Sequence, residues 1–488
     1  MKYLVGVDAG TTGITAILYS EDLKPVRRAY REFPQHFPEP GWVEHDADEI
    51  RAALAAVLTE LLENTTETVV ALGITNQRET VFALNRQTGR AFGRGIVWQD
   101  RRTRATCDRL RQEGHGDWVR ERTGLLLDPY FSASKMQWLL EHREGVAEAA
   151  RQGDLVFATV DSLVLQTLCG GSKWKTDRTN ASRTQLMDLG SGTWDKELSE
   201  LFGVPDGTLP TICASRSEFG EARLPGGRRV PVLGMVGDQQ SALFGQGCWQ
   251  AGDLKTTYGT GCFLMLQTGS QRRDVGGGLL STAAIDGHGG PGFAIEGSIF
   301  AGGSIVQWLR DGLGILSAAR ESETLARQVP DSDGVVLVPA FSGLGAPHWD
   351  PDARAALLGM TRGTGRAHVC RAALDAIAHQ VTDLVELLRS ETGLAVDSMR
   401  VDGGAVTNDL LLQLQADYAG VDVLRARDVE STAKGAAMLA AMHAFGAETV
   451  RGRLAQEPAQ AFRPKWSAGE VARQRDLWRS AIARIKTR

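Results

Sequence analysis

The sequence predicts an α/β protein of two domains. Its 488 residues exceed what a single hydrophobic core usually serves. Segments with strand and helix periodicity alternate along the chain, as is typical of the α/β class. Two glycine-bearing strand–turn–strand units, around Asp8 and around Tyr258, begin the two halves and hint at an ancient duplication, although such a unit can also recur by chance. We therefore expect domains of residues 1–246 and 247–488, with the boundary near residues 244–251.

The first domain is expected to open with two strands. Residues 2–7 and residues 14–19 are rich in β-branched and aromatic side chains, and residues 8–13 between them form a turn of glycine and threonine. Apolar residues then recur at helical spacing from Ile50 to Leu61, directly after an acidic pair that favours a helix N-terminus. This pattern predicts an amphipathic helix.

Two later strands are expected to end in polar clusters. The strand at residues 69–75 is followed by Asn-Gln-Arg-Glu at 76–79, and the apolar run at 230–236 is followed by Asp238 and Gln239. The carboxyl ends of strands are where α/β proteins bind ligands, so both clusters are candidate sites. An equally good reading is that Asp238 caps a helix over residues 239–244, which the spacing permits.

Three glycine-bearing turns are suited to holding phosphate or a flat ligand. Residues 8–13 and residues 258–261 offer unobstructed main-chain N–H groups together with threonine hydroxyls. Residues 402–408 lead from a strand into a helix that should begin near Asp409, with Asn408 as its N-cap. Taken singly, each turn is more often plain hairpin or helix-entry structure. Neither a Walker-type loop nor a dinucleotide fingerprint occurs in the sequence.

The composition excludes several classes of protein. Glycine reaches 56 of 488 residues, about 11% against a usual value of roughly 7%, which predicts many tight turns. The net charge of -5 and the scattered basic residues argue against a nucleic-acid partner. No apolar run is long enough to cross a membrane, so we expect no membrane insertion and a cytoplasmic location. The six widely spaced cysteines suggest reduced, mainly structural thiols.

The motifs DAGTTG, GITNQRET, GIVWQDRRT, GDQQSALFGQ, TTYGTGCF and VDGGAVTN resemble those of the glycerol-kinase group within the FGGY family of carbohydrate kinases. Residues 130–142 and 359–375 resemble the two signatures of that family, so the likeness spans nearly the whole chain. The resemblance implies two ribonuclease-H-like domains flanking a catalytic cleft, as in actin, hexokinase and the Hsp70 ATPase. It further implies ATP on the C-terminal side of the cleft and the polyol on the N-terminal side.

The resemblance also assigns roles to residues of this chain. Hydrogen bonds to glycerol are expected from Arg78, Glu79, Tyr130, Asp238 and Gln239, and an apolar wall from Trp98 and Phe263. The nucleotide is expected to lie against Thr11, Thr12, Gly13 and Thr260 at its phosphates and against Gly303, Gln307, Gly404 and Asn408 beyond them. Asp238 is the candidate general base, with an ordinary pKa of about 3.9. Mg²⁺ is expected at Asp8, through water, and near Asp238.

The expected activity is therefore the ATP-dependent conversion of glycerol to sn-glycerol 3-phosphate, in a homodimer or homotetramer. Alternatives are a kinase for another polyol or sugar, or a catalytically weak polyol sensor. Thr15 stands where the family usually has arginine or lysine, and Ala9, Gly13 and Ile14 replace its usual Gln-Ser-Ser. Near Arg229 the chain loosely matches the loop that binds fructose 1,6-bisphosphate in some bacterial members, although the segment is also an ordinary basic turn.

Overall fold

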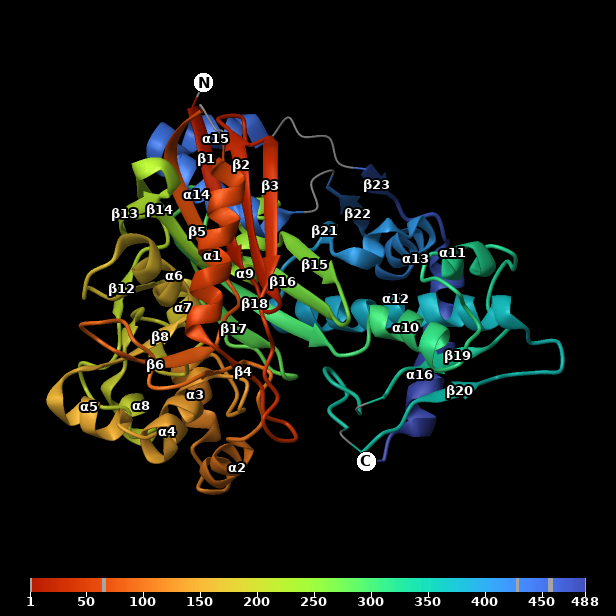
Figure 1. Ribbon diagram of the computed structural model, residues 1–488. Coiled ribbons are helices and arrows are strands. Elements are labelled where there is room, and N and C mark those ends of the chain that lie inside the picture. Colours follow the sequence, from red (N-terminus) through yellow and green to blue (C-terminus); the bar gives the residue numbers. More distant parts are fainter. Residues whose placement is uncertain are drawn as a thin grey trace.

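The computed structural model describes residues 2–63, 67–341, 343–350, 352–426, 430–454 and 460–487. It contains two large mixed sheets with helices packed against them (Figure 1), which confirms the two-domain α/β class. The first sheet has the order β13-β14-β5-β1-β2-β3, and the second has the order β17-β18-β16-β15-β21-β22-β23. The exact domain boundary stays a prediction, although the chain passes between the two sheets close to it, in the connection from α9 (Asp238–Gly245) to β15.

The bounds of the sheet strands follow the sequence patterns closely. The first sheet consists of β1 (Lys2–Ala9), β2 (Gly13–Ser20), β3 (Pro25–Glu32), β5 (Thr68–Asn76), β13 (Gly220–Leu224) and β14 (Arg228–Gly237). The second consists of β15 (Leu254–Tyr258), β16 (Cys262–Gly269), β17 (Leu280–Ile285), β18 (Pro291–Ile299), β21 (Ser398–Asp402), β22 (Asp422–Arg425) and β23 (Gln460–Phe462). Each strand predicted from the N-terminal sequence is therefore present.

The two sheets share one topology at their centres. In the first, β1 and β2 form an antiparallel hairpin, β5 lies parallel to β1, and β14 lies parallel to β5. In the second, β15 and β16 form the hairpin, β21 lies parallel to β15, and β22 lies parallel to β21. The two turns predicted to bind phosphate are therefore the equivalent hairpin turns of a repeated unit, as a duplication would produce.

The outer helices cover the remaining faces of the sheets. The first sheet is covered by α1 (Ala47–Leu62) and α6 (Val160–Cys169), and α1 begins at Asp46, whose side chain accepts a hydrogen bond from the main chain of Asp48. The second sheet is covered by α12 (Arg366–Thr392) and α13 (Asp409–Ala419), with α10 (Gly303–Asp311), α11 (Glu321–Ala326) and α16 (Ala468–Ile485) around them. Asn408 caps α13 as predicted, accepting from the main-chain N–H of Leu411 at 2.9 Å.

A smaller lobe lies beside the first sheet. Its four-stranded sheet contains β4 (Glu44–His45), β6 (Val81–Asn85), β7 (Gly95–Ile96) and β8 (Leu155–Thr159). Its helices are α2 (Arg104–Gln112), α3 (Gly116–Thr123), α4 (Ser132–His142), α5 (Val146–Gln152), α7 (Arg178–Ala181) and α8 (Lys196–Leu201). The lobe supplies the aromatic residues of the site described below.

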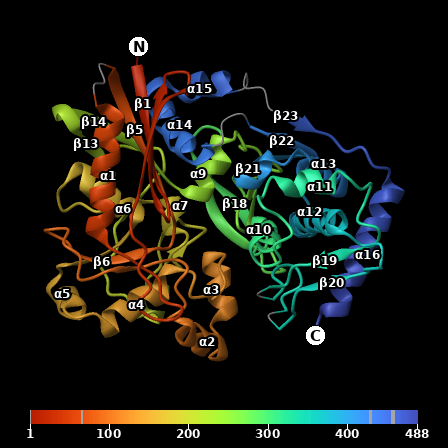
Figure 2. The ribbon, with the colours of Figure 1, turned by 45° about the vertical axis from the view of Figure 1, so that its right-hand side comes forward.

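A helix from late in the chain packs on the first sheet. Figures 1 and 2 both show α14 (Ser431–Phe445) and α15 (Ala447–Leu454) beside β1 and β5, although they follow the second sheet in sequence. The approach is close because Gly6 and Gly73 face the alanine-rich α14. A Cβ atom on them would lie 2.3 Å from the carbonyl oxygen of Ala433 and 2.0 Å from that of Ala436. These glycines therefore serve packing and not ligand binding.

Helix α9 completes the layer between the two sheets. It packs along α14 and against strands of both sheets, and Leu243 joins Met265 and Ala284 in a small apolar cluster. Because α9 begins at Asp238, the candidate base is carried by the element that connects the two domains.

In the described part of the chain, no helix combines the length and apolar character needed to span a membrane.

Candidate active site

Three parallel strands of the first sheet place the candidate residues next to one another. Strand β5 pairs in parallel with both β1 and β14, and Asn76 at its end lies opposite Gly237. Asp8 lies near the carboxyl end of β1, Arg78 follows β5, and Asp238 follows β14. Neighbouring parallel strands end at one edge, so residues distant in sequence meet there.

Arg78 is the centre of a buried cluster of charges. Only 3% of its side chain is exposed, and its Nε lies 3.3 Å from Asp238 Oδ1 and 3.8 Å from Glu79 Oε1. Its Nη1 donates to Gln240 Oε1 at 3.0 Å, and its two terminal nitrogens both donate to Glu296, with Nη2 at 3.2 Å. Burial alone lowers the pKa of Arg78, but the surrounding carboxylates, led by Glu296, hold it well above its ordinary value.

Glu79 has an unusual main-chain conformation. Its φ of 65° lies in the left-handed region, which residues other than glycine rarely adopt. Arg183 donates from Nε to Glu79 Oε1 at 2.6 Å, and Ser132 Oγ donates to the Glu79 carbonyl at 2.9 Å. Strain of this kind persists only where its surroundings impose it, and such surroundings are frequent at functional sites. The Glu79 carboxylate lies between the two arginines, 2.6 Å from Arg183 Nε and 3.8 Å from Arg78 Nε.

Aromatic residues of the lobe line the same region. The rings of Trp98 and Tyr130 meet edge to face, with centroids 5.5 Å apart and planes at 84°. The guanidinium of Arg183 lies over the Tyr130 ring at 5.6 Å, and burial raises the pKa of the Tyr130 phenol. Trp98 also donates from Nε1 to Thr11 Oγ1 at 3.0 Å, which links the predicted apolar wall to the first phosphate turn. Phe263, on β16, is half-buried.

Asp238 is the first residue of α9 and not its N-cap. Gly237 occupies the cap position. Among the described residues, the Asp238 carboxylate accepts a hydrogen bond from the adjacent Gln239 N–H alone, at 2.7 Å, and contacts Arg78. The capping interpretation is therefore wrong. The expected ordinary pKa is also wrong. Burial, reinforced by Glu79 and opposed by Arg78, raises the pKa of Asp238 to about 6.

Asp8 has the character of a cation ligand. Its Oδ1 is buried and has no hydrogen-bond partner within the described residues. Burial, together with the negative charges of Asp238 and Glu430, raises the pKa of Asp8 to about 7. An orphaned carboxylate among like charges is stabilised by a hard cation such as Mg²⁺, which prefers few protein oxygens and several waters. The donor set therefore fits the expected metal.

The first phosphate turn is held by amide side chains. Gln35 donates to the Thr11 carbonyl at 2.9 Å and Gln77 to the Gly10 carbonyl at 3.0 Å, while Thr12 stays exposed. Gly13 is required by its neighbours, because a Cβ atom there would lie 2.6 Å from the carbonyl oxygen of residue 31 and 2.8 Å from the ring of residue 30. The departure from the family pattern at this position thus follows from local packing.

The second phosphate turn packs against the start of α10. The N–H groups of Gly302 and Ser304 donate to the Thr260 carbonyl at 2.9 and 3.1 Å, and that of Gly303 donates to the Gly259 carbonyl at 2.8 Å. The first main-chain N–H groups of α10 are therefore already hydrogen-bonded within the protein. Any contact with phosphate would have to come from the turn at residues 258–261. A side chain on Gly303 would not fit, since its Cβ would lie 2.8 Å from the Gly259 oxygen.

The remaining nucleotide-side residues lie at the surface of the second domain. Gln307 and Gly404 are exposed, and the space where a Cβ of Gly404 would lie is open. Gly403 has a φ of 96°, and a Cβ there would lie 2.5 Å from the carbonyl oxygen of Tyr258, so this turn packs directly on the end of β15. The side-chain oxygen of Asn408, Oδ1, is already used as a helix cap, accepting from the Leu411 N–H.

Four residues of the site were missed from the sequence: Arg183, Gln240, Lys255 and Glu296. Lys255 is fully buried on β15, where its Nζ donates to Gln239 Oε1 at 3.2 Å and lies 3.8 Å from Asp402 Oδ1. It therefore connects a predicted substrate residue with the third glycine turn. A lysine or glutamate inside an apolar strand is costly to bury. The charged side chains of Lys255 and Glu296 within such strands were therefore the feature of the sequence that could have identified them as site residues.

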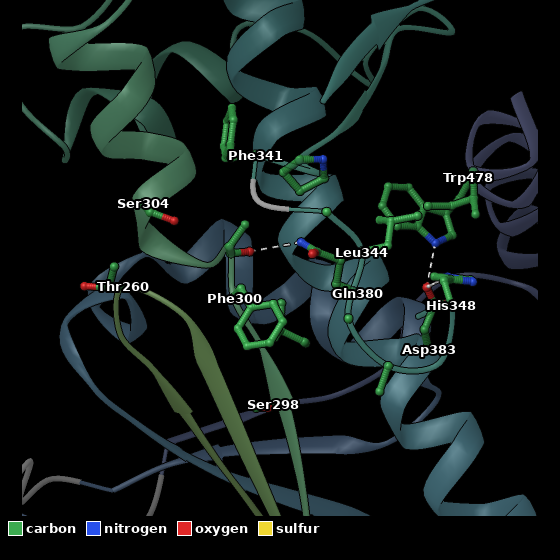
Figure 3. Close-up of a pocket in the computed structure, with 17 residues that line it drawn as sticks. Thr260, Ser298, Phe300, Ser304, Phe341, Leu344, His348, Gln380, Asp383 and Trp478 are labelled. Atoms are coloured by element: carbon green, nitrogen blue, oxygen red, sulfur yellow. Dashed lines mark hydrogen bonds and ion pairs between the residues drawn. The ribbon is translucent and has the colours of Figure 1, made fainter. Parts of the chain in front are cut away.

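A separate cavity lies behind the second phosphate turn. It has a volume of about 240 Å³, and Figure 3 shows Thr260 and Ser304 on one side and Gln380, Asp383 and Trp478 on the other. The Asp383 carboxylate in this cavity accepts a hydrogen bond from Trp478 Nε1 at 2.8 Å, so it already has a partner within the protein. The described residues that line it include none of the strand-end carboxylates, so it is distinct from the charged cluster around Arg78.

Comparison with known proteins identifies the class. Residues 3–245 match the N-terminal domain, and residues 254–444 the C-terminal domain, of the FGGY family of carbohydrate kinases. The chain belongs to this family and is a kinase. The glycerol kinase of Rhodopirellula baltica is 47% identical over 491 residues, covering 100% of this chain and 91% of the relative. That of Alkalilimnicola ehrlichii is 48% identical, covering 99% of this chain and 98% of the relative.

Solved structures agree with this placement. The crystal structure of Plasmodium falciparum glycerol kinase with ADP is 32% identical, has a TM-score of 0.94 and covers 99% of this chain and 98% of that one. A ligand-bound xylulose kinase from Lactobacillus acidophilus is only 20% identical, with a TM-score of 0.87 and 99% of each chain covered, and shares the fold. The expected arrangement of two actin-like domains is thereby confirmed.

Proposed function

We propose that this kinase transfers the γ-phosphoryl group of ATP to a terminal hydroxyl of glycerol, giving sn-glycerol 3-phosphate and ADP. The observation that carries the proposal is the Arg78 cluster, in which an arginine, a strained glutamate and an aspartate of raised pKa meet beside aromatic rings. Curated relatives of nearly equal length that share almost half of the sequence are glycerol kinases. Both features favour a small triol.

The polyol side matches the chemistry of glycerol. A triol presents three hydroxyls that each donate and accept hydrogen bonds, and Arg78 and Glu79 supply a donor and an acceptor side by side. The edge-to-face rings of Trp98 and Tyr130 offer an apolar surface for the carbon chain, with Phe263 proposed opposite them. A larger sugar would need the space that these rings occupy, so the arrangement favours the smallest substrate.

Asp238 acts as the general base in this proposal. As the oxygen–phosphorus bond forms, the proton of the terminal hydroxyl passes to the Asp238 carboxylate, and the bond from the γ-phosphorus to the bridging oxygen of ADP breaks. With a pKa of about 6, Asp238 is mainly ionised at neutral pH yet far less basic than an alkoxide. Proton transfer is therefore late, and positioning and charge neutralisation provide most of the acceleration.

The metal and nucleotide sites follow from the same geometry. Asp8, with Asp238 nearby, would hold Mg²⁺, which supplies charge neutralisation at the phosphates when bound. Thr11, Thr12 and Gly13 of one hairpin turn and Thr260 of the other would contact the phosphates. The base and ribose would extend toward Gly303, Gln307, Gly404 and Asn408. Gln307 and Gly404 are exposed on the second domain, and the open space at Gly404 leaves room for a ligand.

A substrate panel tests the proposal directly. Purified protein with Mg-ATP is assayed for ADP release with glycerol, erythritol, xylulose and gluconate. Glycerol is expected to give the highest kcat/KM. Preference for another member of the panel would contradict the substrate assignment, and release that no substrate stimulates would favour a polyol sensor.

Thr15 offers a test of the phosphate side. In the sheet it lies opposite Asp8 and opposite Tyr30, so its side chain shares a face with the Asp8 carboxylate. Thr15→Arg places a guanidinium near the expected phosphates, and we expect the KM for ATP to fall about tenfold, the effect of one charge-assisted hydrogen bond. Thr15→Met is the control of similar size without charge. Equal ATP KM values in the two variants would show that the cation is unimportant.

We further propose that fructose 1,6-bisphosphate inhibits the enzyme near Arg229. The side chain of Arg229 is 66% exposed on the β13–β14 hairpin and pairs with Glu221 at 3.1 Å. Lys173, Lys175 and Arg223 line the same cavity, of about 280 Å³, so several cations are available for two phosphates.

Arg229→Ala is expected to raise the half-inhibitory concentration of fructose 1,6-bisphosphate about tenfold, because one charge-assisted contact is lost. Arg109→Ala, an exposed position on α2, is the matched control. Equal inhibition of the wild type and Arg229→Ala would dismiss this site.

We also propose a homodimeric or homotetrameric state and a cytoplasmic location. Sedimentation of the purified protein tests the oligomeric state.

A further inference from the structure

Glu296 reaches the polyol site from the opposite domain. It lies on β18 of the second sheet, between the buried Ile295 and Gly297, and is only 8% exposed. Its carboxylate contacts both Arg78 and Arg183, which belong to the first domain, and Arg183 Nη2 lies 3.2 Å from Glu296 Oε2. A carboxylate in an apolar sheet is expensive to bury unless it is paired, so these contacts account for its presence.

The charges of the cluster come from both domains. Two guanidinium groups, of Arg78 and Arg183, face three carboxylates, of Glu79, Glu296 and Asp238. The buried Lys255 of β15 adds a third positive charge that acts on Asp238 and Glu296. Arg78 divides its donors between the carboxylates, with its terminal nitrogens on Glu296 and its Nε toward Asp238. Arg183 likewise joins Glu296 to Glu79. Glu296 therefore determines how both arginines are oriented.

The edge of the second sheet that carries Glu296 is fixed to the first domain. Two residues of β17 contact the first domain. The Thr282 hydroxyl is hydrogen-bonded to the Ser182 hydroxyl at 3.0 Å, and the N–H of Ser281 donates to the carbonyl of Gly124 at 3.0 Å. Gln240, which holds Arg78, also donates to Thr282 at 3.1 Å. Glu296 is thus held in place by contacts on the β17 strand beside it, independently of any nucleotide.

We propose that Glu296 is a positioning residue of the polyol site, which orients the guanidinium of Arg78 toward substrate. The inference rests on the proposed function. Without the Glu296 carboxylate, the two terminal nitrogens of Arg78 lose the acceptor that they share, and the guanidinium is free to turn. Glycerol then loses an oriented donor, and the site loses affinity for it.

Three variants test this role by two measurements. Glu296→Gln removes the charge at constant size, and Glu296→Asp keeps the charge on a shorter side chain. Glu386→Gln, on α12, removes a carboxylate that pairs with Arg475 and is the control. Glycerol affinity is measured by calorimetry without nucleotide, and kcat and the KM for glycerol are measured by steady-state kinetics. We expect Glu296→Gln to bind glycerol about 10- to 100-fold more weakly, with a similar rise in KM and a much smaller change in kcat, and we expect Glu296→Asp to recover part of the affinity. Glu386→Gln should match the wild type in both measurements.

The outcomes separate the two proposals. Wild-type activity on glycerol, together with unchanged affinity and KM in Glu296→Gln, would overturn the role of Glu296 alone. Loss of thermal stability with unchanged glycerol affinity would reduce Glu296 to a structural residue and also contradict the proposal. A wild type that neither binds nor phosphorylates glycerol would overturn the proposed function itself. Should Glu296→Gln not fold, Glu296→Asp carries the test, with weaker glycerol binding at a nearly unchanged kcat expected and unchanged binding contradicting the proposal.

Discussion

Replacing Asp238 by asparagine is expected to lower kcat about 10²- to 10⁴-fold, the usual contribution of a general base, with little change in the KM for glycerol. Asparagine keeps the shape of the side chain and can still accept from the Gln239 N–H. It cannot take up the proton that the attacking hydroxyl releases. Steady-state kinetics with varied glycerol measure the effect, and Asp476→Asn, at an exposed position of α16, is the control. Unchanged turnover in Asp238→Asn would remove Asp238 from the chemistry.

The pH dependence provides a second measure of the same role. The base works as a carboxylate, and burial raises its pKa to about 6, so the active fraction falls as the pH drops through 6. At saturating Mg²⁺, which would keep Asp8 ionised, wild-type kcat should therefore decline below about pH 6 and level off above pH 7. The residual activity of Asp238→Asn should lack this decline. An acid limb near pH 4 in the wild type would instead indicate an unshifted carboxylate.

The sequence predicted the site best where local structure and strand order were sufficient. Arg78 and Asp238 each follow an apolar strand, and the carboxyl end of a strand in an α/β protein is a candidate site whatever the rest of the fold is. The hairpin turns and the cap at Asn408 are likewise local, and the structure contains each of them. These features depend on a few neighbouring residues, which the sequence displays directly.

What the sequence could not predict depends on distant contacts. Glu296 lies 218 residues from Arg78 in the sequence, and its contacts with Arg78 form only when the second sheet docks on the first domain. The packing of α14 on the first sheet similarly requires Gly6, Gly73 and an alanine-rich helix to meet across the whole chain. The raised pKa of Asp238 results from burial by the same docking, so an ordinary value was the natural expectation.

Replacing Arg78 by methionine is expected to destabilise the fold by about 3–5 kcal/mol and to abolish measurable glycerol binding, because breaking a buried ion cluster leaves its carboxylates uncompensated. Glu79 and Glu296 would then keep only their contacts with Arg183, and Asp238 would lose its ion-pair partner. Urea unfolding measures the stability and calorimetry the binding. Arg475→Met is the matched control, because it removes a buried arginine that pairs with Asp383 outside the polyol site. This variant should lose stability but still bind glycerol.

The pH dependence of Arg78→Met distinguishes lost charge from lost packing. Arg78 lowers the pKa values of Asp238 and Glu296, so without it both pKa values rise and the folded state binds more protons than the unfolded state does. Stability should then be greatest at acidic pH and fall as the pH rises toward 8. Adding Glu296→Gln to Arg78→Met removes one of the uncompensated charges and should recover part of the stability at pH 8 but little at pH 5. Equal losses at both pH values, with no recovery in the double variant, would mean that Arg78 stabilises the protein by packing alone.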